Sequence, residues 1–505
     1  MVEAGKLLGL DRCAKAAIGL SLVLCTGSAF AAEKGGSYRI RGDQPQQVIK
    51  GLGFEIQSDS IGSGNAGMPD EVVAVPHDLT AGEKSRFYKE MLHGFRYSRL
   101  AMGLYLRGND AEKKHIVERY PGQMDDLRTM QQVSGIEGFN VEYWSPAPYW
   151  KQDMSYYGGT IRANDPAFLN AFSDAMVDDL KYLQAHGLHI AQWGLQNEPV
   201  VGHLNTKDPK RDSLDAMQSY ATCKYTPEDY AAVLKVTVTK VRALLPNVHI
   251  HAPSWDRPDG PFAAEIRKDP ELLKNIDAWT WHQIGHNSND QIDLQAKYMH
   301  GADGKPVYRN EFEYQPWDIK KIDSPFMNTG QALMNWMVFE NSPTWYWLHA
   351  LKPVTNLEAT GDSLGFWRPA GVLKDNLRPR LEGGHWEFNP QNWNAIAGLL
   401  KYMPWDSTRL TVEESSVEHD QRILVWRSSQ GKLGIALSNR GSEPYMFHLA
   451  GVEAKSLSGH RYTIAAINSA LGLKHSSEYA ITGPPPAVIR ILDGPLVVHP
   501  GLDLL

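Results

Sequence analysis

The stretch Trp193-Gly194-Leu195-Gln196-Asn197-Glu198-Pro199 decides the fold of this chain, together with residues 188–192 before it. The pattern is typical of a buried strand that ends at Asn197-Glu198, because Pro199 lacks the amide hydrogen that further sheet pairing needs. A carboxylate then lies at the C-terminal end of a strand, where parallel (β/α)8 barrels keep their reactive side chains. Hydrolysis of glycosidic bonds generally uses two carboxyl groups. A second acidic residue is therefore expected at a later strand end.

Residues 305–311, Lys-Pro-Val-Tyr-Arg-Asn-Glu, supply that second acid. Glu311 follows Glu198 by 113 positions, which corresponds to about three strand–helix units. The two glutamates would then end the fourth and seventh strands, which face each other across the mouth of a barrel. Retaining glycosidases place their two carboxyl groups about 5–5.5 Å apart. We therefore expect Glu198 and Glu311 to be the catalytic pair, although either glutamate alone would more simply be half of an ion pair.

The rest of the chain supports a barrel. Helices are predicted between the strands, most clearly after Asp165-Pro166 and Thr226-Pro227, where a capping side chain precedes a proline at the first helical position. This alternation predicts an α/β fold with a (β/α)8 TIM barrel over residues 51–405. A doubly wound open sheet is the alternative, but no glycine-rich fingerprint follows the first strand. Eight strand-like runs are centred near residues 53, 98, 141, 192, 250, 280, 308 and 346.

The last hundred residues have a different texture. From residue 406 to 505, short apolar runs such as 423–426 and 433–437 alternate with turns such as Gln430-Gly431. This pattern predicts an appended antiparallel β-sandwich domain. Residues 32–50 are expected to add N-terminal strands to it.

Residues 1–31 have the pattern of a signal peptide. Basic residues up to Lys15 precede an apolar run from Ala16 to Cys25, which is followed by Ala29-Phe30-Ala31. We expect cleavage near Ala31 and a secreted or periplasmic protein; an uncleaved anchor or a lipoprotein is the alternative. Cleavage would leave Cys223 as the last of three cysteines, so the mature chain would have no internal disulfide.

Charge limits the classes of partner. The formal net charge is −7. The predicted signal peptide carries a net charge of +1, so its removal would make the mature chain more negative still. Nucleic acid is therefore not expected as a partner. No later segment approaches 18 uninterrupted apolar residues, so membrane insertion is not expected. We expect a monomer that acts on a β-linked carbohydrate.

Other predicted strand ends supply candidate substrate-binding residues. Arg99 is placed to pair with the nucleophilic carboxylate and keep its pKa low. Asn197 is placed to hold a sugar 2-hydroxyl, and His282 to hydrogen-bond the nucleophile or a hydroxyl. Trp144 and Trp347 are expected to offer ring faces to the sugar. A salt bridge for Arg99, a structural role for His282 and core packing for the tryptophans are the simpler alternatives.

Histidine spacing raises a metal-dependent hydrolase as another interpretation. His282 and His286 are four residues apart, and His249 and His251 lie two apart. The second pair falls along a predicted strand, and no metalloprotease pattern includes either pair. We expect no metal and no other cofactor.

Taken together, these residues resemble glycoside hydrolase family 30, or a close relative in the (β/α)8 clan of retaining glycosidases. The resemblance covers about residues 37–505 and implies Glu198 as acid/base, Glu311 as nucleophile, and activity on β-linked glycans. The matching positions are Gly51-Leu52-Gly53-Phe54, Arg99, Trp144-Ser145-Pro146, Asn197-Glu198-Pro199, His282, Glu311 and Trp347.

Two features leave alternatives open. The seventh strand ends Asn310-Glu311-Phe312-Glu313, so Glu313 is a rival nucleophile on the same strand face. Basic residues at 107, 151 and 162 fall in predicted mouth loops, so an acidic glycan is conceivable, although such residues are usually just solvated. We predict a secreted retaining β-glycosidase that works through a covalent glycosyl-enzyme intermediate. A non-catalytic glycan-binding protein on the same barrel is the second interpretation.

Overall fold

A computed structural model gives the arrangement of the chain. The predicted signal peptide lies outside the residues that it describes, and so does Glu313. The described residues are 34–56, 79–103, 108–110, 115–118, 121–154, 158–200, 221–255, 257–282, 302–312, 325–348, 350, 366–369, 386–388, 390–441, 443–452, 457–462, 476–481, 488–491 and 494–499.

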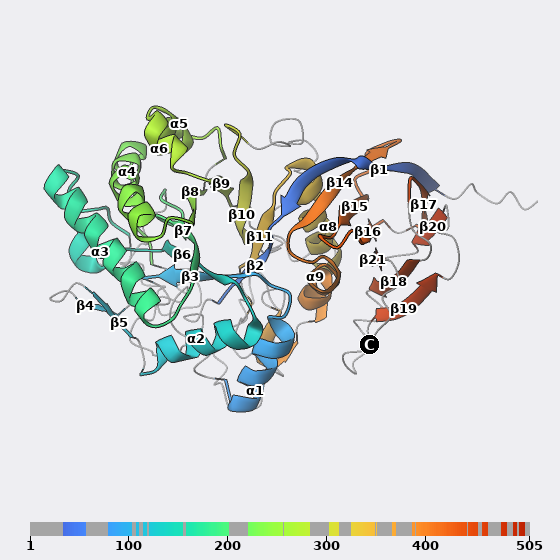
Figure 1. Cartoon of the computed structure of the whole chain (residues 1–505), viewed down its shortest axis with the longest axis horizontal. Helices are drawn as coiled ribbons and strands as arrows, with labels where there is room; N and C mark the ends of the chain where they lie inside the picture. The colour runs from blue at the N-terminus through green and yellow to red at the C-terminus, as the bar shows by residue number, and fades with distance from the viewer. Residues whose placement is uncertain are drawn as a thin grey trace, which may run out of the picture. The chain divides into compact units, whose positions relative to one another are not determined.

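The prediction of a (β/α)8 barrel is confirmed. Eight parallel strands close into a barrel in the order β10-β11-β2-β3-β6-β7-β8-β9 (Figure 1). Each falls at one of the positions predicted from the sequence. The strands are β2 (Gly51–Glu55), β3 (Tyr97–Met102), β6 (Gly138–Tyr143), β7 (Ile190–Gly194), β8 (His249–Trp255), β9 (Ala278–Trp281), β10 (Val307–Phe312) and β11 (Thr344–Trp347).

These strands are buried on both faces, although they contain polar residues. Every residue of β3, β6 and β10 is buried, because one face of each strand fills the barrel and the other packs under helices. The polar residues within these strands therefore have no route to solvent except at the mouth. Their side chains must be satisfied inside the barrel.

Local signals fix the ends of the barrel helices. Asp165 caps α3, where its Oδ1 accepts the amides of Ala167 and Phe168, and Thr226 caps α4 by accepting the amide of Asp229. Both helices begin with the predicted proline. The helices are α1 (Ala81–Arg86), η3 (Phe87–Met91), α2 (Gln123–Ser134), η4 (Pro148–Trp150), α3 (Pro166–Ala185), α4 (Pro227–Leu244), α5 (Pro261–Arg267), α6 (Pro270–Lys274), α8 (Pro325–Phe339) and α9 (Pro390–Tyr402).

The appended β-domain is also confirmed, and the chain's N-terminal part belongs to it. Strand pairing joins nine strands in one curled sheet, in the order β19-β18-β21-β16-β15-β14-β1-β17-β20. Its strands are β1 (Lys34–Ile49), β14 (Ser407–Glu414), β15 (Gln421–Arg427), β16 (Leu433–Asn439), β17 (Tyr445–Ala450), β18 (Leu457–Tyr462), β19 (Ser476–Ile481), β20 (Val488–Ile491) and β21 (Gly494–His499).

Strand β1 lies between two strands from the other end of the sequence. It pairs antiparallel with β14, with Tyr38 opposite Glu414, and parallel with β17 (Figure 1). The chain then passes directly from β1 into the first barrel strand. Two further ribbons, β4 (Gly108–Asp110) with β5 (His115–Val117) and β12 (Trp367–Pro369) with β13 (Trp386–Phe388), complete the described strands.

Helix α8 connects the β-domain to the barrel through buried polar contacts. Arg422 Nε donates to Asn335 Oδ1 over 2.7 Å, and Ser438 Oγ donates to Gln331 Oε1 over 3.1 Å. Among the described helices, none combines the length and the hydrophobicity that a membrane crossing requires.

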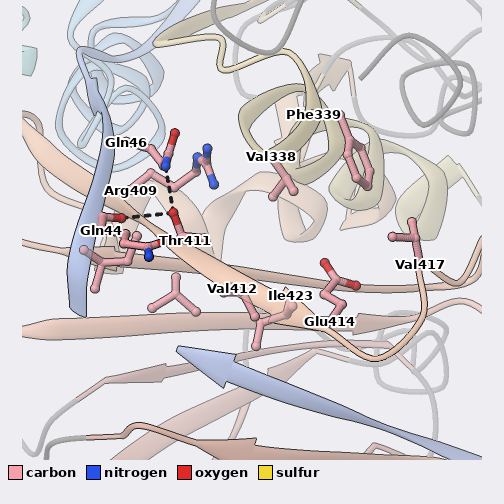
Figure 2. Close-up of a pocket in the computed structure, with 12 residues that line it drawn as sticks. Gln44, Gln46, Val338, Phe339, Arg409, Thr411, Val412, Glu414, Val417 and Ile423 are labelled. Carbon is pink, nitrogen blue, oxygen red and sulfur yellow. Dashed lines mark hydrogen bonds between the residues drawn. The ribbon is translucent and has the colours of Figure 1, made fainter. Parts of the chain in front are cut away.

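A cavity of about 300 Å³ lies between β1, the end of α8 and β14. Gln44, Gln46, Arg409 and Thr411 gather at one end of it, and Glu414 lies at the other (Figure 2). The Thr411 hydroxyl accepts from Gln46 Nε2 and donates to the carbonyl of Gln44. Most of the remaining lining is aliphatic, and the ring of Phe339 is buried. This lining offers no open aromatic face of the kind on which sugars stack.

Candidate active site

The backbone turns sharply at the predicted acid, which lies four residues after β7 ends at Gly194 rather than at the strand end itself. Glu198 has a φ of 44°, an uncommon conformation for a residue with a Cβ. Two hydrogen bonds hold it, one from the Asn197 amide to Tyr143 O over 2.7 Å and one from the Glu198 amide to Ser254 O over 3.0 Å. The neighbouring strands β6 and β8 therefore fix the turn that orients the Glu198 side chain. Strained backbone conformations of this kind occur mostly at functional sites.

The two predicted acids and His282 meet at the mouth of the barrel. Oxygens of Glu198 and Glu311 and a ring nitrogen of His282 all lie within 4.8 Å of one another. His282 Nδ1 lies 3.2 Å from Glu198 Oε1 and 3.4 Å from Glu311 Oε2. The three residues are 7%, 5% and 7% exposed for Glu198, Glu311 and His282 respectively. This geometry presents two carboxylates to a small, largely water-excluded space.

Arg99 organises the floor beneath this pair. Its Nη1 donates to Glu311 Oε2 over 2.6 Å and to Glu55 Oε2 over 2.9 Å. Its Nη2 donates to Asn197 Oδ1 over 2.7 Å, and both Nε and Nη2 donate to Glu142 Oε2. One guanidinium from β3 thus connects side chains from β2, β6, β10 and the end of β7.

The electrostatics differ from the sequence expectation at one point. Burial raises the pKa of Glu311 above its ordinary value, and neighbouring Glu198 adds to that rise, against the opposing effects of His282 and Arg99. The expectation that Arg99 would keep this pKa low is therefore wrong in net effect, although the predicted pairing is present. The loss of hydration raises the pKa of this buried carboxyl group by more than the shared Arg99 guanidinium lowers it.

The pKa values of Arg99 and Glu142, in contrast, both shift in the direction that keeps the group charged. Burial alone would lower the pKa of Arg99, but Glu142, Glu55 and Glu311 outweigh it and raise that pKa. Glu142 has its pKa lowered because the charge and hydrogen bonds of Arg99 and a hydrogen bond from Ser254 overcome its own burial. Arg99 and Glu142 therefore form a permanent ion pair in the floor of the site.

A second layer supports Glu142 with side chains from β8 and β10. Asn310 Nδ2 donates to Glu142 Oε2 over 3.0 Å and to Ser254 Oγ over 3.1 Å. His251 Nε2 lies 2.8 Å from Asn140 Oδ1, and burial lowers the pKa of His251 to about 4. This histidine is neutral at ordinary pH and belongs to the hydrogen-bonded floor rather than to an acid–base pair.

Sequence reasoning missed Glu55 and Glu142, the two buried carboxylates that share Arg99. A signal for Glu142 was present, since Asn140, Glu142 and Trp144 alternate with apolar residues along a strand expected to be fully buried. Polar residues at alternate positions of such a strand mark its inward face. Glu55 ends the first predicted strand just as Glu198 follows the fourth.

The predicted tryptophans are present but enclosed. Trp144 is 1% exposed, and its ring lies under the Arg99 guanidinium at 4.2 Å. Trp347 is 0% exposed and packs against Trp345 and Phe366. Trp144 therefore supports Arg99 through a cation–π contact, and neither ring offers an open face to the mouth.

Other candidates fall away from the mouth or outside the described residues. Lys151 is buried, and its Nζ donates to Thr222 O and Ser145 Oγ, so it is a structural cation rather than a contact for an acidic glycan. Arg162 is exposed. Burial raises the pKa of Cys223 to about 12, which suits a structural thiol. Glu313, His286 and Arg107 lie outside the described residues.

The Glu198, His282 and Glu311 atoms are also close enough for a metal ion to bind. The arrangement is equally explained by hydrogen bonding, because Nδ1 of His282 lies within reach of both carboxylates. The described part of the chain places His251 in the floor of the site, bonded to Asn140.

No protein-family model matches the sequence, and no curated protein sequence matches it. Solved structures do match the fold. The catalytic domain of a GH30 xylanase C from Talaromyces cellulolyticus is similar with a TM-score of 0.64 at 12% identity, covering 92% of this chain and 99% of that one.

Two further structures show the same architecture. An endo-β1,6-glucanase is similar with a TM-score of 0.61 at 11% identity, over 92% of this chain and 93% of that one. A GH51 arabinofuranosidase from Xanthomonas axonopodis pv. citri has a TM-score of 0.56 at 10% identity, over 92% and 99%. The resemblance predicted from the sequence is therefore confirmed at the level of fold: the chain has the barrel and appended β-domain of the GH30-type glycosidases.

Proposed function

We propose that this protein is a secreted retaining β-glycosidase that hydrolyses β-linked polysaccharides or oligosaccharides. The observation that carries the proposal is the meeting of Glu198 and Glu311, whose oxygens lie within 4.8 Å at two strand ends of the barrel. A separation of about 5–5.5 Å between the two carboxyl groups suits double displacement, because an inverting pair lies farther apart to leave room for a water molecule. The fold shared with glycoside hydrolases supports the same reaction class.

In the first step, the Glu311 carboxylate attacks the anomeric carbon of the sugar. The bond from that carbon to the leaving oxygen breaks, and Glu198 gives its proton to that oxygen. The product is an ester between the sugar and Glu311. Arg99, which donates to Glu311 Oε2 over 2.6 Å, holds the carboxylate in its attacking orientation.

In the second step, Glu198 takes a proton from water, and the water oxygen attacks the anomeric carbon. The ester bond to Glu311 then breaks, which restores both carboxyl groups and retains the anomeric configuration. His282 contacts both acids and stabilises negative charge on whichever one is ionised. Asn197, fixed through its Oδ1 by Arg99, keeps its amide nitrogen for a sugar hydroxyl.

The protein is exported through its N-terminal signal, with cleavage near Ala31, and acts outside the cytoplasm as a monomer. It needs no metal or other cofactor, since two carboxyl groups and water balance the reaction.

A hydrolysis screen of the mature protein tests the proposal. The substrates are xylan, β-1,6-glucan and other β-linked glycans, together with aryl β-glycosides. Glu198→Gln and Glu311→Gln should each lose at least about 10³-fold in kcat, and azide should rescue Glu198→Gln on an activated aryl glycoside. Glu413→Gln, at an exposed position near the end of β14, is the matched control and should retain full activity.

Three outcomes would change the proposal. Full activity in Glu311→Gln with loss in Glu313→Gln would move the nucleophile. Glycan binding without turnover across the panel would favour a binding protein. Loss of wild-type activity with a chelator, restored by a divalent metal ion, would favour a metal-dependent hydrolase.

A further inference from the structure

The cavity between β1, α8 and β14 contains a buried cation without an acidic partner. Arg409 of β14 lines this cavity and is 5% exposed. Its Nε donates to Gln47 Oε1 over 2.6 Å, and its Nη2 donates to Asn341 Oδ1 over 3.2 Å. Both acceptors are neutral amide oxygens. No carboxylate of a described residue forms an ion pair with Arg409, and burial lowers its pKa to about 10, so the group remains charged at neutral pH.

The other buried arginines in the described part of the chain each have a carboxylate. Arg99 pairs with Glu142, Arg309 with Glu340 and Arg422 with Glu414. A buried charge is costly unless it is paired, so Arg409 departs from the pattern that this chain follows elsewhere. Because Arg409 lines a cavity rather than a packed core, there is room beside it for an anion supplied from solution.

The polar groups beside Arg409 suit a carboxylate. Gln44, Gln46 and Thr411 lie at the same end of the cavity (Figure 2). The Thr411 hydroxyl accepts from Gln46 Nε2 over 2.7 Å, which holds that amide and leaves its second hydrogen for another acceptor. A carboxylate has two acceptor oxygens and pairs well with a guanidinium. This end of the cavity therefore favours an anion that accepts several hydrogen bonds.

The rest of the cavity favours an aliphatic body without a second negative charge. Side chains such as Val338, Val412 and Ile423 form most of the remaining lining (Figure 2). At the other end, Glu414 Oε2 lies 3.6 Å from Arg422 Nη1. Because Arg422 is already paired, a second anionic group would meet Glu414 there rather than a free cation.

The cavity is accessible and its size limits the ligand. Gln44 is exposed at one end, and Val417 near the other end is 41% exposed. The volume is about 300 Å³. At about 30 Å³ for each non-hydrogen atom, the cavity holds on the order of ten such atoms, as many as a straight-chain carboxylate of eight carbons contains.

We propose that this cavity binds a small aliphatic monocarboxylate, whose carboxylate lies against Arg409 and whose hydrocarbon chain lies along the aliphatic side chains of β14, β15 and α8. None of the residues that line the cavity belongs to the active site. The inference therefore goes beyond the proposed function and does not depend on it.

Calorimetric titration of the mature protein with three eight-carbon compounds tests the chemistry. Octanoate has the proposed carboxylate and chain, octanamide replaces the charge with a neutral amide, and suberate adds a second carboxylate. Octanoate should bind with a Kd below about 1 mM, as a ligand of about ten atoms can. Octanamide and suberate should each bind at least about 10-fold more weakly, because charge-assisted hydrogen bonds are the stronger ones and a buried second charge is costly.

Variants identify the cavity as the place of binding. Arg409→Gln removes the cation and should weaken octanoate binding at least about 10-fold. Val338→Phe fills the space from α8 without touching the cation, and should also weaken binding at least about 10-fold; it carries the test if Arg409→Gln fails to fold. Arg39→Gln is the matched control, because Arg39 is an exposed arginine of β1 that does not line the cavity. Its affinity for octanoate should equal that of the wild type.

Each outcome decides the matter. Octanoate binding that depends on Arg409 and on the space beside Val338 supports the inference. A wild type that does not bind octanoate, or binds octanamide equally well, would overturn it. Unchanged octanoate binding in folded Arg409→Gln or Val338→Phe would overturn it as well, since the ligand would then lie elsewhere. The titration involves no turnover, so a failure here leaves the proposed glycosidase function standing, and loss of that function leaves this site standing.

Discussion

His282 lies against Glu198, with Nδ1 of the ring 3.2 Å from Oε1 of the carboxylate. The same nitrogen lies 3.4 Å from Glu311, so one donor serves both acids. His282→Ala should lower kcat/KM about 10²-fold, because a buried carboxylate loses its charge-assisted partner. His282→Asn should retain more activity, since the Asn amide nitrogen can take the place of Nδ1. Steady-state kinetics on an aryl β-glycoside checks the order, and equal loss in both variants would contradict it.

Removal of divalent metal ions should leave activity unchanged. The proposed reaction balances with two carboxyl groups and water, although the Glu198, His282 and Glu311 atoms are close enough to accept an ion. Wild-type turnover is measured before and after exhaustive treatment with EDTA, alongside metal analysis of the untreated protein. Stoichiometric zinc together with loss of turnover would be the contrary result.

The buried Asp179 of α3 should make stability depend on pH. Burial raises its pKa from 3.8 to about 7, against the opposing hydrogen bond from Tyr143. A folded-state pKa above the unfolded value means that its contribution is fully favourable below about pH 4 and is lost as the pH rises through 7. The wild type should therefore lose up to about 4 kcal/mol of stability from this group between those limits.

Asp179→Asn should remove most of that dependence and be more stable than the wild type at pH 8. Urea unfolding at pH 5 and pH 8 measures the difference. Asp174 of the same helix is exposed and pairs with Lys240, so Asp174→Asn is the matched control and should behave like the wild type. Identical pH dependence in Asp179→Asn and the wild type would mean that other groups dominate.

Gly53 should tolerate no side chain. A Cβ at this position would lie 2.2 Å from two ring carbons of Tyr346, on the neighbouring strand β11. Tyr346 has little freedom to move, because its hydroxyl donates to Gln192 over 2.9 Å and its ring stacks on Tyr97. Gly53→Ala should destabilise the barrel by about 2–3 kcal/mol.

The control is another glycine in open space. A Cβ at Gly82 in α1 meets nothing within 4 Å, so Gly82→Ala should be neutral or stabilise by up to about 1 kcal/mol. Thermal or urea unfolding compares the two variants. A Gly53→Ala protein as stable as the wild type would show that strand β11 yields more easily than its contacts imply.

The barrel was predictable because its strands carry two signals at once. Runs such as residues 278–281 are largely apolar, and proline or glycine marks where chain segments stop, as Pro199 does after Glu198. The acids at two strand ends then follow from barrel geometry, since every parallel strand delivers its C-terminal end to the same mouth. Spacing along the chain therefore carried three-dimensional information.

The floor of the site was less predictable because its interactions cross between strands. Glu142 and Glu55 are distant in sequence from each other and from Glu311, and only strand order brings them to Arg99. The enclosure of Trp144 and Trp347 also depends on packing that composition does not reveal. The net sign of the pKa shift of Glu311 is set by burial, which no motif encodes.

Strand β1 gives the chain an unusual order of assembly. Its ladder partners are β14 and β17, which begin at Ser407 and Tyr445, so β1 has no ladder partner until those much later segments have been made. Contacts of such long sequence separation form slowly, and a waiting strand exposes unpaired backbone. Until β14 and β17 have been made, β1 is an unpaired edge just before the first barrel strand, and such edges can pair with other chains.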